Sequence, residues 1–140
     1  PQDGPIFPDF ACSTKTKMDR HQVAVIKMEK GDAITASAEA FYLMKQRGIK
    51  NVIVMGVHTN MCVLGRSFGI RQMVRLGYNV VLARDLTDAM YDPRQAPFVS
   101  HTRGTELVVE HIETYWCPSL LGADLTRIVP GSADPVVGNK

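Results

Sequence analysis

Long hydrophobic runs and concentrations of one charge are both absent from this chain of 140 residues. Its apolar runs, such as NVIVMGV at residues 51–57, are far shorter than the roughly 18 residues that span a bilayer, and no charged-then-apolar leader opens the chain. We therefore expect no membrane association. The sixteen basic and fourteen acidic residues are scattered, leave a net charge of +2 and form no basic tract that could hold a phosphate backbone. We expect no nucleic-acid partner.

Cysteine is also scarce. The chain has three cysteines, Cys12, Cys62 and Cys117, which are far apart in sequence and odd in number. This pattern argues against a disulfide framework and favours a reducing, cytoplasmic location. No CxxC pair is present, and His101 and His111 have no partners at metal-ligand spacing. We therefore expect neither a metal site nor a cofactor.

The apolar residues that are present alternate between two kinds of pattern. Short apolar runs predict strands at residues 23–28, 51–56 and 78–84. Apolar residues at helical spacing predict helices at residues 35–47, 62–76 and 104–116. Strands that are apolar on both faces and alternate with helices are typical of a parallel sheet covered on each side. The fold class predicted from the sequence is therefore α/β.

The length and the 45% hydrophobic content suit one domain over residues 1–140. Residues 1–22 hold three prolines and no periodic pattern, so we expect an extended loop there. The α/β core is predicted to span residues 23–117. Residues 118–140 lose the periodicity, and we expect a C-terminal tail of packed loop followed by loose chain.

Cys62 lies where the predicted strand at 51–56 turns into the predicted helix at 62–76. In an open parallel sheet, ligands bind outside the carboxyl ends of the strands, where such turns gather. A thiol at a helix N-terminus lies near unpaired backbone N–H groups and the positive end of the helix dipole, which favour the thiolate. The same N–H groups can hold a developing oxyanion. The alternative is that Cys62 is a small apolar filler.

The segment GVHTNMCV at residues 56–63, followed by GYNVVLARDLTDA at 77–89, resembles the isochorismatase-like cysteine hydrolases, a family that includes nicotinamidases and carbamoyl-amidases. The resemblance covers roughly residues 23–117. It implies a Rossmann-like, three-layer α/β/α fold with a mainly parallel sheet. It also implies hydrolysis of an amide or related C–N or ester bond in a small-molecule substrate, and a homo-oligomer in which neighbouring subunits complete the pockets.

Residue by residue, the resemblance implies that Cys62 is the nucleophile and that the Val57–His58 peptide bond is cis. The backbone N–H groups of His58 and Cys62 then form the oxyanion hole. A Cys–His dyad through the His58 imidazole is an alternative, because histidine is a common partner of nucleophilic cysteine. Asn60 is a candidate substrate-binding residue. Turn chemistry is the alternative role for both Thr59 and Asn60.

The family lysine that stabilises the thiolate matches Lys27, with Lys30 as the alternative. The family's general-base aspartate has no counterpart, since no strand of the type apolar-apolar-Asp-x-Gln precedes residue 23 and Asp9 lacks a preceding strand. Two functions therefore remain open. The chain is a hydrolase whose aspartate lies in a segment outside it, or it is a non-catalytic module of the same fold that serves in binding or oligomerisation.

Three further charged residues follow the turn that carries Cys62, residues 56–63, which we call the elbow. Asp85 matches the family's acidic residue after the third predicted strand, and we expect it to accept backbone N–H bonds in a turn. Arg66 and Arg71, on the predicted helix after Cys62, could face a substrate carboxylate or a partner subunit, although solvent exposure is the commoner fate of such residues.

Overall fold

A computed structural model describes residues 24–35 and 38–128, and the chain divides into two compact units, Pro1–Thr35 and Ala36–Lys140. In the first unit, the strand predicted at residues 23–28 is wrong over its described part, which consists of turns and irregular backbone. Val25 is 86% exposed, and no described strand pairs with this segment. A short apolar run gains nothing from an extended conformation when no neighbouring strand satisfies its backbone. The extended loop expected at residues 1–22 lies outside the described residues.

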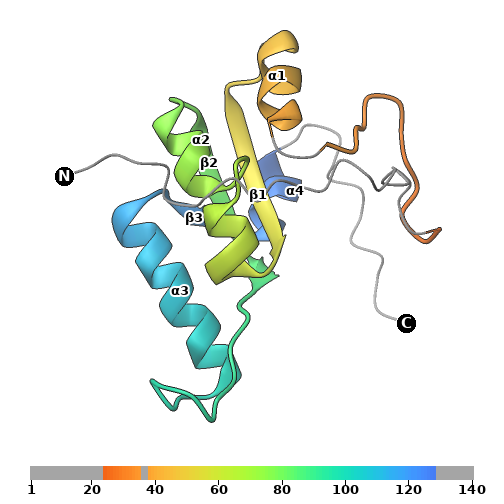
Figure 1. The fold of residues 1–140 in the computed structure, drawn as a ribbon. Coiled ribbons are helices and arrows are strands. Elements are labelled where there is room, and N and C mark those ends of the chain that lie inside the picture. The colour runs from red at the N-terminus through yellow and green to blue at the C-terminus, as the bar shows by residue number, and fades with distance from the viewer. Residues whose placement is uncertain (1–23, 36–37, 129–140) are drawn as a thin grey trace, which may run out of the picture. The chain divides into compact units, whose positions relative to one another are not determined.

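The second unit contains a parallel sheet of three described strands in the order β1-β2-β3, with bounds β1 Asn51–Val57, β2 Asn79–Asp88 and β3 Ser119–Leu120. Both neighbouring pairs of strands are parallel, as the sequence predicts. The first two strands begin in register, with Asn51 opposite Asn79 and the two side-chain amides joined by a hydrogen bond of 2.8 Å. The carboxyl ends of β1 and β2 therefore lie at the same edge (Figure 1).

Strand β2 is longer than the predicted strand at 78–84. Its register with β1 changes between Val54 and Gly56: Val54 lies opposite Leu82, whereas Gly56 lies opposite Thr87. The extra residues on β2 bulge out of the ladder, and the strand then resumes. Asp85 consequently lies within β2 and not after a strand. The residues of β2 beyond the predicted strand, 85–88, are mainly polar and form no apolar run, so the sequence did not predict this continuation.

Two helices agree with the sequence apart from their ends. Helix α1 covers Glu39–Gln46, and Gly48 follows it with φ +65°, a conformation that glycine adopts without steric cost. Helix α3 covers His101–Tyr115 and begins three residues earlier than predicted. It begins there because the Ser100 hydroxyl accepts the Arg103 N–H at 3.2 Å and caps the first turn.

The helix predicted at 62–76 is wrong in one respect, because it is interrupted. A π-helical turn, η1 Thr59–Val63, comes first, and helix α2 Ile70–Arg75 follows after an irregular connection. Gly69 lies at the break, where a β-carbon would stand only 2.8 Å from the Arg66 backbone nitrogen. The chain approaches itself so closely there that only glycine fits.

The C-terminal tail predicted at 118–140 is also wrong over its described part. Residues 119 and 120 form β3, and helix α4 Gly122–Ile128 follows. The Asp85 carboxylate accepts the Gly122 N–H at 2.8 Å, which places the start of α4 against β2. The short segment shows little periodicity because one side of a two-turn helix offers few apolar positions. Residues 129–140 lie outside the described part.

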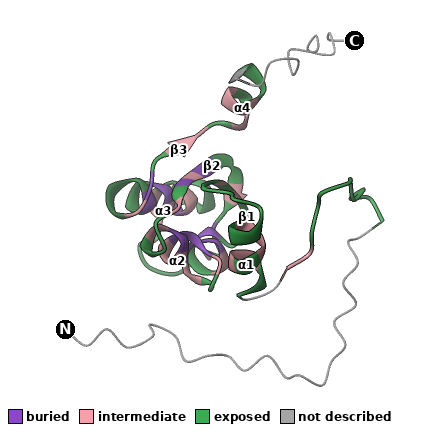
Figure 2. Cartoon of the chain, turned by 90° about the horizontal axis from the view of Figure 1, so that it is seen from above, coloured by how far each residue is buried: buried purple, intermediate pink, exposed green. Residues whose placement is uncertain are grey.

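The core lies between the sheet and the helices η1, α2 and α3, with α4 on the opposite side of the sheet (Figures 1 and 2). Alternate residues of β1 and β2 point into it. The fully buried members with the largest side chains are Ile70, Leu82 and Ile112. This α/β arrangement places the turn after β1, with Cys62, at the carboxyl edge of the sheet.

Candidate active site

Cys62 is the fourth residue of η1, in the turn that leaves the carboxyl end of β1. Its thiol is free and only partly buried. The peptide bond between Val57 and His58 is cis, as the resemblance implies. The His58 carbonyl accepts the N–H groups of Met61 and Val63, at 3.0 and 3.2 Å, and so closes the turn around Cys62.

A chain of hydroxyl groups holds this turn against the sheet. Thr87 donates to the Gly56 carbonyl at 2.7 Å, and the hydroxyls of Thr59 and Thr87 are 2.6 Å apart. Because Thr87 has a single hydroxyl proton and uses it on Gly56, Thr59 must be the donor between the two threonines. Thr59 is completely buried, so its hydroxyl needs this partner. The interaction supports the turn-shaping role for Thr59.

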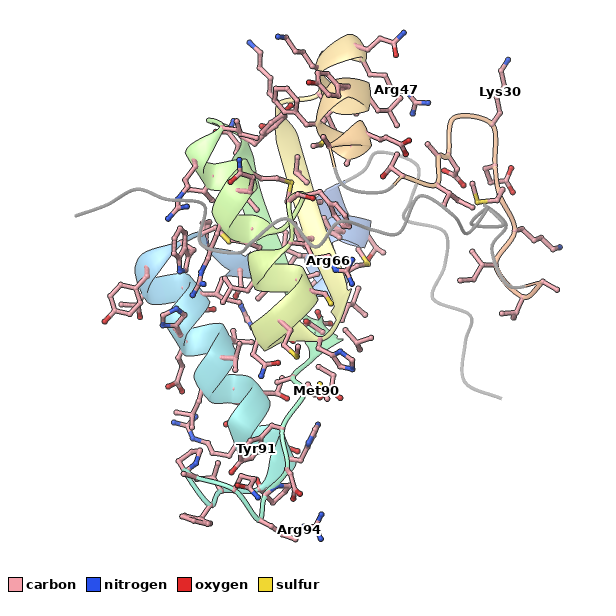
Figure 3. All side chains as sticks on the ribbon, viewed as in Figure 1. Lys30, Arg47, Arg66, Met90, Tyr91 and Arg94 are labelled. Atoms are coloured by element: carbon pink, nitrogen blue, oxygen red, sulfur yellow. The ribbon has the colours of Figure 1, made fainter. Side chains whose placement is uncertain are left out.

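The Asn60 side chain is joined to the backbone of Met90. Its amide nitrogen donates to the Met90 carbonyl at 3.0 Å, and its oxygen accepts the Met90 N–H at 2.9 Å. This reciprocal pair connects η1 to the segment that follows β2, near the label of Met90 in Figure 3. It favours the turn-shaping role, while substrate binding by Asn60 stays a prediction.

A polar cluster lies at the end of β2, beside the elbow. Asp88 is opposite Val57 in the sheet register. Its Oδ1 atom receives hydrogen bonds from His101 Nε2, at 2.8 Å, and from the Thr105 hydroxyl, at 3.0 Å. Thr105 in turn accepts the Ala89 N–H at 3.1 Å. From the sequence, His101 was weighed only as a metal ligand, and Asp88 lies beyond the strand predicted at 78–84, so this cluster was not predicted.

His101 also lies 2.9 Å from the Tyr91 carbonyl through Nδ1. A carbonyl only accepts, so Nδ1 carries a proton, and in the charged form of the ring a second proton on Nε2 faces the Asp88 carboxylate. The hydrogen bond to Asp88 and, next, that to Tyr91 raise the pKa of His101, and the hydrogen bonds from His101 and then Thr105 lower the pKa of Asp88. Both side chains are about half exposed, so solvent screens the pair.

Two cavities flank these elements. One, of about 660 Å³, lies over the end of β2 and the start of α3 and is lined by the Asp88 cluster together with charged residues of α3. The other, of about 370 Å³, lies against Asn60 of η1 and against Leu64, the residue that follows η1. Cys62 lines neither of the two. Within residues 24–35 and 38–128, no group of three or more His, Cys, Asp or Glu side chains is placed to hold a metal ion.

The other predicted site residues are dispersed. Lys27 and Lys30 are both exposed and belong to the first unit, which is described separately from the elbow, so the assignment of Lys27 stays a prediction.

Arg66 is exposed beside the break after η1 (Figure 3), whereas Arg71 is partly buried and its guanidinium lies over the Trp116 ring. Asp85 accepts a backbone N–H, as expected, although its donor is Gly122.

The parallel sheet with its flanking helices makes this an α/β protein, and Cys62 lies in the turn after one of its strands. The family model described as the isochorismatase domain matches residues 23–110, and the chain belongs to this family. No curated protein matches it. No helix in the described part of the chain is long and apolar enough to span a bilayer.

A crystal structure of a cysteine hydrolase from Pseudomonas syringae pv. phaseolicola 1448A has a similar fold, with a TM-score of 0.53 and 22% sequence identity. The match covers 64% of this chain and 41% of that one. The chain thus spans less than half the length of this structural neighbour. At this identity the likeness concerns the fold.

Proposed function

We propose that this chain carries the nucleophile of a cysteine hydrolase that cleaves an amide or related C–N or ester bond in a small molecule. The observation that supports it most is the position of Cys62, a free and partly buried thiol in the turn after β1 of an isochorismatase-family sheet. Turns at this edge of a parallel sheet are where ligands bind.

In the proposed reaction, the Cys62 thiolate attacks the carbonyl carbon, and the carbonyl oxygen becomes an oxyanion held by the N–H groups of His58 and Cys62. The tetrahedral species expels the amine or alcohol and leaves an acyl group on Cys62. Water then hydrolyses this thioester and regenerates the thiol. Lys27 is proposed to stabilise the thiolate, and Asn60 to contact the substrate.

The proton transfers distinguish esters from amides. Among the described residues, no hydrogen bond joins the Cys62 thiol to an acid or base. An amine leaves only after it gains a proton, and general acid–base catalysis typically contributes about 10²- to 10⁴-fold in rate. A nitrophenolate leaves without one. We therefore expect the chain to be acylated by p-nitrophenyl acetate but to hydrolyse simple amides such as nicotinamide poorly.

The experiment compares p-nitrophenol release by the wild-type chain and by the Cys62→Ala variant. The proposal expects release that is lost in the variant. Equal release by both proteins would overturn it. Cys62-dependent turnover of nicotinamide at enzymatic rates would show instead that this chain supplies its own general acid.

Three substitutions assign the supporting roles. His58→Ala keeps the backbone N–H, so it leaves acylation nearly unchanged if the oxyanion hole is made by the backbone. It abolishes acylation if the imidazole forms a Cys–His dyad. Lys27→Met should slow acylation more than Lys30→Met, and the reverse order would transfer the role to Lys30.

We also propose that copies of the chain associate, as in the oligomers that the resemblance implies. Strand β1 is at the edge of the described sheet, and three of its apolar side chains are exposed: Ile53 by 43%, Met55 by 50% and Val57 by 63%. Parallel strands are normally buried on both faces. Sedimentation equilibrium of the wild type and of Met55→Lys tests the proposal, which expects a dimer or larger species that the variant loses. A wild-type monomer would contradict it.

A further inference from the structure

The cavity of about 370 Å³ lies behind η1, on the side lined by Asn60 and Leu64, and extends to α3. Its walls are mainly apolar, with Leu107 and Val108 contributed by α3 and Pro97 by the loop before that helix. Its volume lies within the range of small-molecule sites. The cavity is therefore large enough for a compact organic ligand.

Tyr91 forms one wall and is held in place (Figure 3). Its ring lies directly over Gly104, where a β-carbon would be only 2.3 Å from the ring. Its hydroxyl accepts the Val99 N–H at 3.1 Å and lies 3.1 Å from the Gln95 carbonyl. Glycine thus makes room for the ring, and the hydroxyl fixes it, so this wall exists before any ligand binds.

The charge of the cavity comes from Arg71. None of the lining residues is acidic, and His111 is the other lining residue able to carry a positive charge. The guanidinium of Arg71 is stacked over Trp116, with its central carbon 5.1 Å from the ring centroid. Its Nε atom is buried, and within the described residues it has no hydrogen-bond partner. A buried donor without a partner costs free energy, but this nitrogen is closed off from the cavity, so a ligand there would meet only the remaining part of the guanidinium.

We propose that this cavity binds a small organic carboxylate with an apolar body. The carboxylate pairs with Arg71, whose planar guanidinium suits the two oxygens, and stacking on Trp116 holds the guanidinium in position. The apolar body packs among Leu64, Leu107 and Tyr91. Cys62 does not line the cavity, so a ligand bound there does not occupy the nucleophile. Asn60 lines it and belongs to the same turn as Cys62.

Calorimetric titration with benzoate and with its neutral isostere benzamide tests the site. We expect benzoate to bind at one site per chain and at least about tenfold more tightly than benzamide, since hydrogen bonds to a charged group are strong. Arg71→Gln should remove this preference. The matched control is Arg75→Gln, because Arg75 lies over the same Trp116 ring, at 5.8 Å, but does not line the cavity. It should change benzoate affinity less than about twofold.

A second variant and the nucleophile variant locate the ligand. Leu107→Phe places a larger side chain in the cavity and leaves less room, so it should weaken benzoate binding. Cys62→Ala should leave benzoate binding unchanged. Equal affinity for benzoate and benzamide in the wild type would overturn the proposal without any variant. So would undetectable benzoate binding, an equal loss in the two arginine variants, or a loss in Cys62→Ala. Failure of esterolysis with intact benzoate binding would overturn only the proposed hydrolysis.

Discussion

The Oδ1 atom of Asp88 and the Nε2 atom of His101 are 2.8 Å apart, and this hydrogen bond joins the end of β2 to the start of α3. The twelve residues between them leave the sheet, pass Tyr91 and return. Because His101 also binds the Tyr91 carbonyl, its ring fixes both ends of this excursion. The segment lies beside the elbow, since Met90 is bound to Asn60.

The ion pair predicts a pH-dependent stability. The raised pKa of His101 gives stabilisation that is full below its unfolded value, about 6.5, and is lost as the pH rises through its folded value. The lowered pKa of Asp88 gives stabilisation that is present above about 3.9 and is lost as the pH falls through its folded value. The pair therefore stabilises most between about pH 4 and 6.5.

NMR titration of the histidine ring protons should place the pKa of His101 above 6.5, and Asp88→Asn should lower it towards that value. Asp92→Asn is the matched control, because Asp92 pairs with Arg94 instead. An unchanged His101 titration in Asp88→Asn would show that the carboxylate does not cause the shift.

The threonine chain predicts unequal costs for two similar substitutions. Thr87→Val leaves the buried Thr59 hydroxyl and the Gly56 carbonyl without their partner, and should lower the free energy of unfolding by about 1–3 kcal/mol. Thr59→Val leaves the Thr87–Gly56 bond intact and should cost less. Urea denaturation of both variants and of the double variant should show that the two effects are not additive. Additive effects would mean that the hydroxyls do not act as a chain.

Gly104→Ala should destabilise the protein, although alanine is normally better in a helix by about 1 kcal/mol. The added methyl group would meet the Tyr91 ring at 2.3 Å and displace it. In a Tyr91→Ala background the clash is absent, so the same substitution should become stabilising. Thermal denaturation of the four proteins measures the change of sign, and destabilisation in both backgrounds would contradict the packing.

The two described cysteines should differ in reactivity. Cys117 is buried, and burial raises the pKa of its thiol to about 11, so little thiolate exists at neutral pH. Cys62 is more accessible. Iodoacetamide at about pH 7.5, followed by peptide mapping, should label Cys62 at least about tenfold faster than Cys117 in the folded protein. Denaturant should remove the difference, and faster labelling of Cys117 in the folded chain would contradict the packing around it.

The sequence predicted the parallel sheet and the elbow, because short apolar runs that alternate with periodic helices are typical of a parallel α/β fold. It missed the interruption after η1, where the deciding factor is how closely the backbone passes Gly69. It also missed β3 and α4, which are too short to show a period. A strand predicted from four apolar residues near Val25 failed because an apolar pattern does not show whether a partner strand is present.

Site residues near one another in sequence were easier to predict than those joined by the fold. Val57, His58 and Cys62 belong to one segment, so a motif connects them. Asp88 and His101 meet only because β2 continues beyond its bulge and α3 begins at Ser100. Arg71 was expected to be exposed or to face a substrate carboxylate or a partner subunit. Its stacking on Trp116 depends on the packing of α2 against the residue after α3.

The most direct measurement is mass spectrometry of the chain after brief exposure to p-nitrophenyl acetate and quenching in acid, which preserves a thioester. We expect one acetyl group per chain, mapped to the peptide that contains Cys62 and absent from Cys62→Ala. Acetylation spread over lysines, or located at Cys12 or Cys117 with Cys62 unmodified, would contradict the claim that the elbow cysteine is the nucleophile.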